Sequence, residues 1–154
     1  MKKILRKLFP VVIIVVLVGL IYSFFHIDGR EIKNIKMLSY DTRVSIIIND
    51  TYGHSNRQEY ELNAKQIDAL KNLLKNNSYK RRLSSTIIGQ LPEKEYTILA
   101  DWDGGTPQML LYIKILGNEY INFSHQFNIL NHNIYHKIQD SDFEKELISI
   151  LETE

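Results

Sequence analysis

A continuous apolar segment near the N-terminus constrains this 154-residue chain more than any other feature. It covers residues 8–25 and contains no charged side chain. Four cationic residues precede it: Lys2, Lys3, Arg6 and Lys7. As a helix the segment would rise about 27 Å, close to the ~30 Å thickness of the hydrocarbon core of a bilayer. The sequence therefore predicts a transmembrane helix over residues 8–25.

The flanking charges predict the orientation of this helix. Residues 26–31 carry only Arg30 against Asp28 and Glu31, so the positive side is the N-terminal tip, residues 1–7, which is expected in the cytoplasm. A cleaved signal peptide is the alternative, but its apolar region is usually ~7–15 residues and ends at a small-x-small site that residues 22–26 lack. We expect an uncleaved single-pass anchor in the cell membrane, a juxtamembrane linker over residues 26–30 and an extracytoplasmic domain over residues 31–154.

Composition limits what the exported part can do. Four of the 19 Lys and Arg residues lie in the leader, which leaves 15 against 18 Asp and Glu, a formal charge of about −3. This charge is the opposite of a nucleic-acid footprint, so no nucleic-acid partner is expected. The chain has no cysteine and hence no disulfide, but a domain of about 125 residues can form a core without one. The usage of Ile, Lys and Asn is typical of a low-GC Gram-positive bacterium.

Hydrophobic periodicity predicts a mostly antiparallel sheet. Strands are expected over residues 32–38, 42–49, 57–62, 79–88, 96–102, 109–115, 119–124 and 133–139. Gly104-Gly105 and Gly117-Asn118 are typical hairpin-turn residues. Lys80, Arg81 and Arg82 would alternate between the two faces of an edge strand, so they are not expected to form one basic patch.

Two amphipathic helices complete the predicted fold. Asn63 and Gln66 have the spacing of a capping box before a helix over residues 64–76, and Asn76-Asn77 is expected to end it in the left-handed conformation. Ser141 and Glu144 predict a second box, before an apolar stripe made of Phe143, Leu147, Ile150 and Leu151. The fold class is therefore α+β, with one N-terminal transmembrane helix and a mostly antiparallel sheet covered on one face by two amphipathic helices.

Few residues have the pattern of a metal or catalytic site. His132 and His136 stand four residues apart and, with Asp101, form a weak candidate metal site for a hydrolase. The alternative is that His136 faces the core between Ile134 and Ile138. Residues 101–105 begin like a calcium loop but depart from it at the fifth and sixth positions, which favours a hairpin turn. We assign no catalytic residue, metal or cofactor.

Trp102, the only tryptophan, ends a predicted strand beside a turn. A ring of this size either seals the edge of the core or offers a contact surface, because its body is apolar and its N–H is polar. It is a candidate contact residue.

The order of apolar positions resembles that of uncharacterised extracytoplasmic domains of low-GC Gram-positive bacteria, which are short single-pass proteins or appendages of membrane-embedded sensor peptidases. The resemblance covers about residues 31–152 and rests on Ile32-x-x-Ile35, Tyr60-x-Leu62, Ile67-x-x-Leu70-x-x-Leu73-Leu74-Lys75-Asn76, Glu95-Tyr96-Thr97-Ile98, Ile134-x-x-x-Ile138 and Phe143-x-x-x-Leu147-x-x-Ile150-Leu151. It transfers no catalytic residue. The expected function is a membrane-anchored binding or regulatory module of unknown ligand, with another envelope protein as a candidate partner; the alternative is a small metal-dependent envelope hydrolase using His132, His136 and Asp101.

Overall fold

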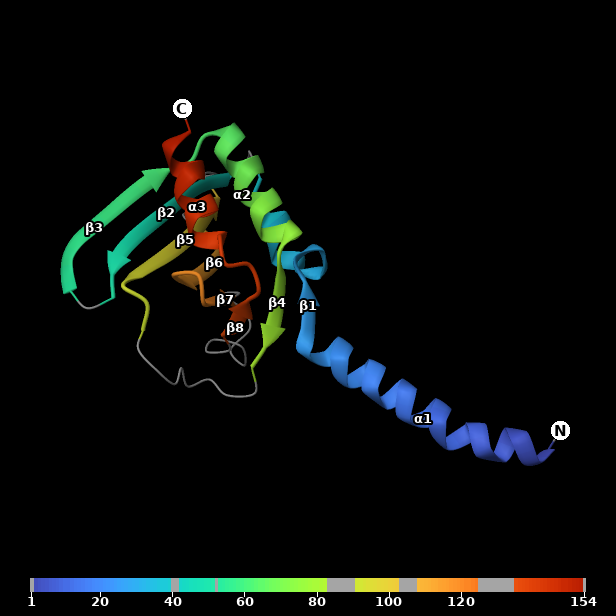
Figure 1. The fold of residues 1–154 in the computed structure, drawn as a ribbon. Helices are drawn as coiled ribbons and strands as arrows, with labels where there is room; N and C mark the ends of the chain where they lie inside the picture. The colour runs from blue at the N-terminus through green and yellow to red at the C-terminus, as the bar shows by residue number, and fades with distance from the viewer. Residues whose placement is uncertain are drawn as a thin grey trace.

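The computed structural model describes residues 2–39, 42–51, 53–82, 91–102, 108–124 and 135–153. Within these ranges one eight-stranded sheet carries helices α2 and α3 on one face, and helix α1 leaves the sheet at one edge (Figure 1). The strand order is β1-β4-β8-β7-β6-β5-β2-β3, and each neighbouring pair is antiparallel. The expected α+β class and the mostly antiparallel sheet are confirmed.

The elements in chain order are α1 (Lys2–Phe25), β1 (His26–Asp28), the 3-10 helices η1 (Gly29–Glu31) and η2 (Lys33–Met37), β2 (Thr42–Asp50), β3 (Gly53–Glu61), α2 (Ala64–Asn76), β4 (Ser78–Arg81), β5 (Lys94–Trp102), β6 (Gln108–Leu116), β7 (Tyr120–Ser124), β8 (His136–Ile138) and α3 (Phe143–Glu152).

Helix α1 extends away from the body of the protein (Figure 1). Its large apolar side chains from Phe9 to Phe24 are 43–68% exposed, so they form no part of the core. Among the residues whose side chains the structure describes, which in α1 are residues 9–25, no helix has both the length and the apolar character of a membrane span. The transmembrane helix expected over residues 8–25 is therefore not confirmed and stays a prediction.

The core lies between the sheet and the two helices α2 and α3. Ile46, Ile98 and Ile113 are directly opposite one another on adjacent strands, and all three are fully buried. The stripes of α2 and α3 close over this face, with Leu70 and Leu147 also fully buried. Burial of such side chains contributes about 1.5–3 kcal/mol each, so this cluster is the main source of stability.

The predicted capping boxes have different outcomes. Before α2, Asn63 Oδ1 accepts from the N–H of Gln66 at 3.0 Å, and Gln66 Oε1 accepts from the N–H of Asn63 at 2.9 Å. The box expected at Ser141 and Glu144 is wrong, because Asp142 is the N-cap and makes no side-chain cap. Glu144 Oε1 instead accepts from the Tyr96 hydroxyl at 2.7 Å. A tertiary partner has replaced the local one.

The strand expected over residues 32–38 is also wrong, since Lys33–Met37 forms the 3-10 helix η2, which Ile32 and Leu38 cap. Ile35 and Leu38 are fully buried and Ile32 packs against the core. A spacing of three residues aligns side chains on one side of a 3-10 helix, whereas a strand would send alternate residues to opposite faces. The period of three at Ile32, Ile35 and Leu38 therefore favours the observed structure.

Three further expectations change. Residues 26–30 are not a free linker, because His26–Asp28 forms strand β1. Strand β4 is not an edge strand, since it lies between β1 and β8. Asn77 has φ −89°, not the left-handed conformation, and its Nδ2 donates to the carbonyl of Leu73 at 3.0 Å.

The turn at Gly117-Asn118 is confirmed as a hairpin. Gly117 has φ +48°, and Leu116 is paired with Tyr120, so the loop has three residues where two were expected. The turn expected at Gly104-Gly105 lies outside the described residues.

Candidate interaction site at the junction of α1 and the sheet

The two described members of the predicted metal site do not converge. His136 on β8 lies on the same face as buried Ile138, and its ring is edge-on to that of Phe123 at 6.1 Å. Asp101 on β5 follows buried Ala100 and so points to the opposite face. Strands β7 and β6 separate the two residues as well. The half-buried His136 faces the core side of the sheet, in agreement with the alternative offered by the sequence.

Of the other predicted site residues, His132 lies outside the described residues, as does Ile134. Within the described ranges, no three His, Cys, Asp or Glu side chains gather as metal ligands would. The backbone of Trp102 ends β5, paired with Thr42 and Gln108, but its side chain lies outside the described part. The contact role of Trp102 therefore stays a prediction.

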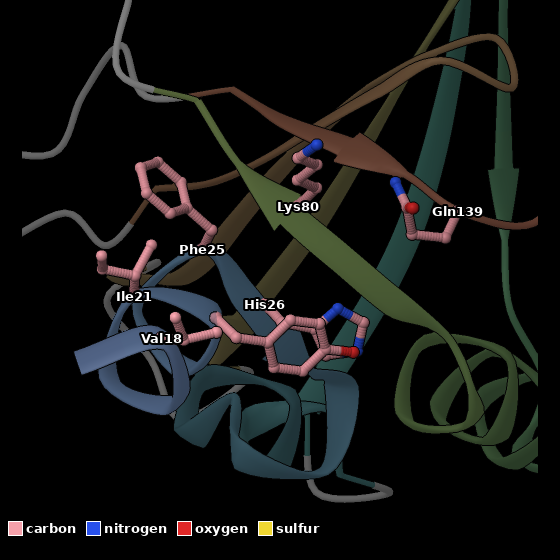
Figure 2. A pocket seen from close by; sticks show the side chains of 7 residues that line it. Val18, Ile21, Phe25, His26, Lys80 and Gln139 are labelled. Carbon is pink, nitrogen blue, oxygen red and sulfur yellow. The ribbon is translucent and has the colours of Figure 1, made fainter. Parts of the chain in front are cut away.

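Helix α1 and the sheet meet with no intervening residue, because α1 ends at Phe25 and β1 begins at His26. An open pocket of about 500 Å³ lies at this junction (Figure 2). Figure 2 shows Val18, Ile21 and Phe25 of α1 along one side and Lys80 and Gln139 on the other. Tyr22 and His26 complete the lining, and their rings stack at 5.2 Å. One wall of the pocket is therefore apolar and the other is polar and cationic.

Contacts at the two ends of β4 hold the end of α1 and strand β1 in this position. The guanidinium of Arg81 lies 4.7 Å from the ring centroid of Phe24, a cation–π contact. Beyond β1, the N–H of Gly29 donates to the carbonyl of Asn77 at 2.9 Å, which joins the chain to the end of α2. The last turn of α1 is thus attached to the domain by side chains and the following strand by its backbone.

A row of basic side chains crosses three strands beside the pocket. His26 is paired with Lys80, and Lys80 is paired with Lys137. Directly paired residues of antiparallel strands point to the same face, so these three side chains lie on one face of the sheet, which we call the basic row. Arg82, two residues along from Lys80, lies over the ring of Tyr120 at 4.9 Å. Sequence reasoning missed the row because it considered each strand alone; pairing the strands expected at 79–88 and 133–139 would have revealed it.

A second polar group on the sheet surrounds Lys114. Its Nζ lies 2.7 Å from Glu95 Oε2, with the two side chains 28% and 20% exposed. Burial lowers the pKa of Lys114, but the hydrogen bond and charge of Glu95 more than offset this, so the pKa lies above its usual 10.5. Burial also raises the pKa of nearby Tyr135. A lysine held protonated in this way forms a structural ion pair and does not act as a base or nucleophile at neutral pH.

Comparisons with known proteins leave the family open: no family model, curated protein or solved structure matches the chain. The resemblance to extracytoplasmic domains of Gram-positive bacteria therefore stays a prediction.

Proposed function

We propose that this protein is a membrane-anchored extracytoplasmic binding or regulatory module, with α1 as its anchor. The observation that carries the proposal is the exposure of α1. Apolar side chains on every side of the helix are 43–68% exposed, from Phe9 to Phe24. A helix that is apolar all round is unfavourable in water and is typical of a membrane span.

The charges at the two ends of α1 support the orientation of the module. Lys2, Lys3, Arg6 and Lys7 precede the apolar segment, and positively charged flanks stay in the cytoplasm. The sheet domain would then lie outside the membrane. The absence of any residue between α1 and β1 supports a domain held at the membrane surface, so that a ligand bound near β1 or β4 would act close to the bilayer.

Membrane extraction tests the anchor. The full chain should pellet with membranes after alkaline carbonate treatment, and external protease should digest the part that follows α1 while the N-terminal tip is protected. The charged double substitution of Val15 and Val16 to Arg should release the protein, since an Arg at the centre of a span costs about 2.5–3.5 kcal/mol. Substitution of the same two residues by Leu is the matched control and should change nothing. Release of the wild-type chain by carbonate would refute the proposal.

A further inference from the structure

We propose that the junction pocket and the basic row together bind the head group of an anionic phospholipid in the outer leaflet. This inference rests on the proposed function, because it needs the end of α1 to lie at the membrane surface. It goes beyond that function by assigning a ligand class to a particular site.

The shape of the pocket fits an amphiphile. Its apolar wall, made of Val18, Ile21 and Phe25, is continuous with the exposed apolar surface of α1. Its other wall carries the ammonium of Lys80 and the amide of Gln139 (Figure 2). If α1 spans the bilayer, acyl chains pack along the first wall, and the phosphate of the same lipid reaches the second.

The charge of the basic row favours an anion. Lys80 and Lys137 are both exposed and directly opposite each other, an arrangement in which like charges repel. Among the described residues, no ion pair neutralises either of them. The carboxylate on the adjoining strand, Asp28, accepts from the N–H of Arg30 at 2.9 Å. A bound phosphate would relieve the repulsion between the two lysines.

This attraction is local, because the exported part as a whole has a formal charge of about −3. Cations close to a membrane surface act on anionic lipids only within about a Debye length. The position of the row next to the end of α1 therefore matters more than the net charge of the domain.

Photo-crosslinking of the full chain in vesicles tests the site. Equimolar phosphatidylcholine and phosphatidylglycerol vesicles would contain a photoactivatable probe of one lipid or the other, and cross-linked peptides would be identified by mass spectrometry. In the wild type, the phosphatidylglycerol probe should label residues 18–26 more strongly, by about fivefold for each cation that contacts the head group. Labelling of the leader, residues 1–7, with the same probe serves as an internal standard when variants are compared with the wild type, because none of the variants changes the leader.

The double variant Lys80→Gln and Lys137→Gln should bring labelling of residues 18–26 down to the phosphatidylcholine level. The matched control, Lys65→Gln and Lys145→Gln, removes the same charge from exposed positions on α2 and α3 and should keep the preference. The site would be overturned if both double variants lost the preference for the phosphatidylglycerol probe equally. It would also be overturned if the Lys80 and Lys137 variant kept that preference. Suppression of labelling by soluble glycerol phosphate would identify a free phosphate compound as the ligand and would overturn the assignment of a phospholipid.

Failure of this inference is distinct from failure of the proposed function. A chain that resists carbonate extraction but shows no preference between the two probes keeps its anchor and loses its lipid site. A chain that carbonate releases has no anchor, and both proposals fall together.

Discussion

Gly29 decides whether the chain that follows α1 can lie against the end of α2. An added Cβ would be 2.8 Å from the carbonyl oxygen of Asn77 and 2.9 Å from that of Lys75, and closer still to that of Leu74. These are backbone atoms, which cannot rotate away. We expect Gly29→Ala to lower the free energy of unfolding by about 1–3 kcal/mol.

The measurement is chemical unfolding of the full chain in detergent micelles. Gly19→Ala is the matched control, because nothing lies within 4 Å of its added Cβ. Equal midpoints for the two variants would contradict the close approach at Gly29.

Two buried tyrosines set the response to alkaline pH. Tyr79 is fully buried and donates to the carbonyl of Leu74 at 2.8 Å, and burial raises its pKa well above the usual 10.0. Burial, with the hydrogen bond and charge of Glu144, also raises the pKa of Tyr96. With the folded pKa above the unfolded one, the stabilisation is complete below pH 10.0 and is lost as pH rises toward the folded pKa. The free energy of unfolding of the domain should therefore fall as the pH rises above 10.0.

Tyr79→Phe tests this behaviour. It should cost about 1 kcal/mol at neutral pH through the lost hydrogen bond, and it should make the alkaline decline shallower. Tyr60→Phe, at an exposed hydroxyl on β3, should leave both unchanged. Urea unfolding at neutral and alkaline pH measures both effects; a decline of unchanged slope would show that Tyr79 does not contribute.

At the scale of elements, Gln66 connects the start of α2 to the end of α3. Its Oε1 serves the capping box, while its Nε2 donates to the carbonyls of Ile150 at 3.1 Å and Thr153 at 2.9 Å. Gln66→Glu keeps an acceptor for the box but turns two donations into repulsion between oxygens. We expect it to cost about 1–3 kcal/mol and to increase amide exchange near the end of α3.

Asn63→Ala separates the two roles of Gln66. It removes only the cap of α2, so it should cost about 1 kcal/mol and leave exchange in α3 unchanged. If Gln66→Glu affected exchange only at the start of α2, the contact between the helices would have no energetic weight.

At the scale of the whole molecule, β1 belongs to the sheet domain and not to helix α1. A chain starting at His26 keeps the pairing of β1 with β4 and the bond from Gly29 to Asn77. We expect that chain to be a monomer that unfolds cooperatively. A chain starting at Ile32 exposes the edge of β4, so it should be less stable and should associate through that edge. Light scattering and urea unfolding compare the two chains. Equal molar masses and equal unfolding midpoints would show that β1 is only a linker.

Local sequence determined the elements whose signals are short in range. The Asn63–Gln66 box and the apolar spacing after it predicted α2 to the residue, and the alternation over residues 42–49 predicted β2 except for its last residue, Asp50. Gly117 marked its turn because a positive φ suits glycine. For the capping box and the turn, the partners of a residue lie within a few positions of it, so the local sequence contains the whole interaction.

Tertiary structure decided what depends on distant partners. The carboxylate of Glu144, expected in the second box, accepts instead from the hydroxyl of Tyr96, forty-eight residues away. The residues after α1 form a strand because β4 offers an edge for pairing. The basic row likewise exists only where β1, β4 and β8 are paired, since Lys80 and Lys137 are far apart in the sequence. Hydrophobic period gives the face of a strand but not its neighbours, and the neighbours assemble the candidate site.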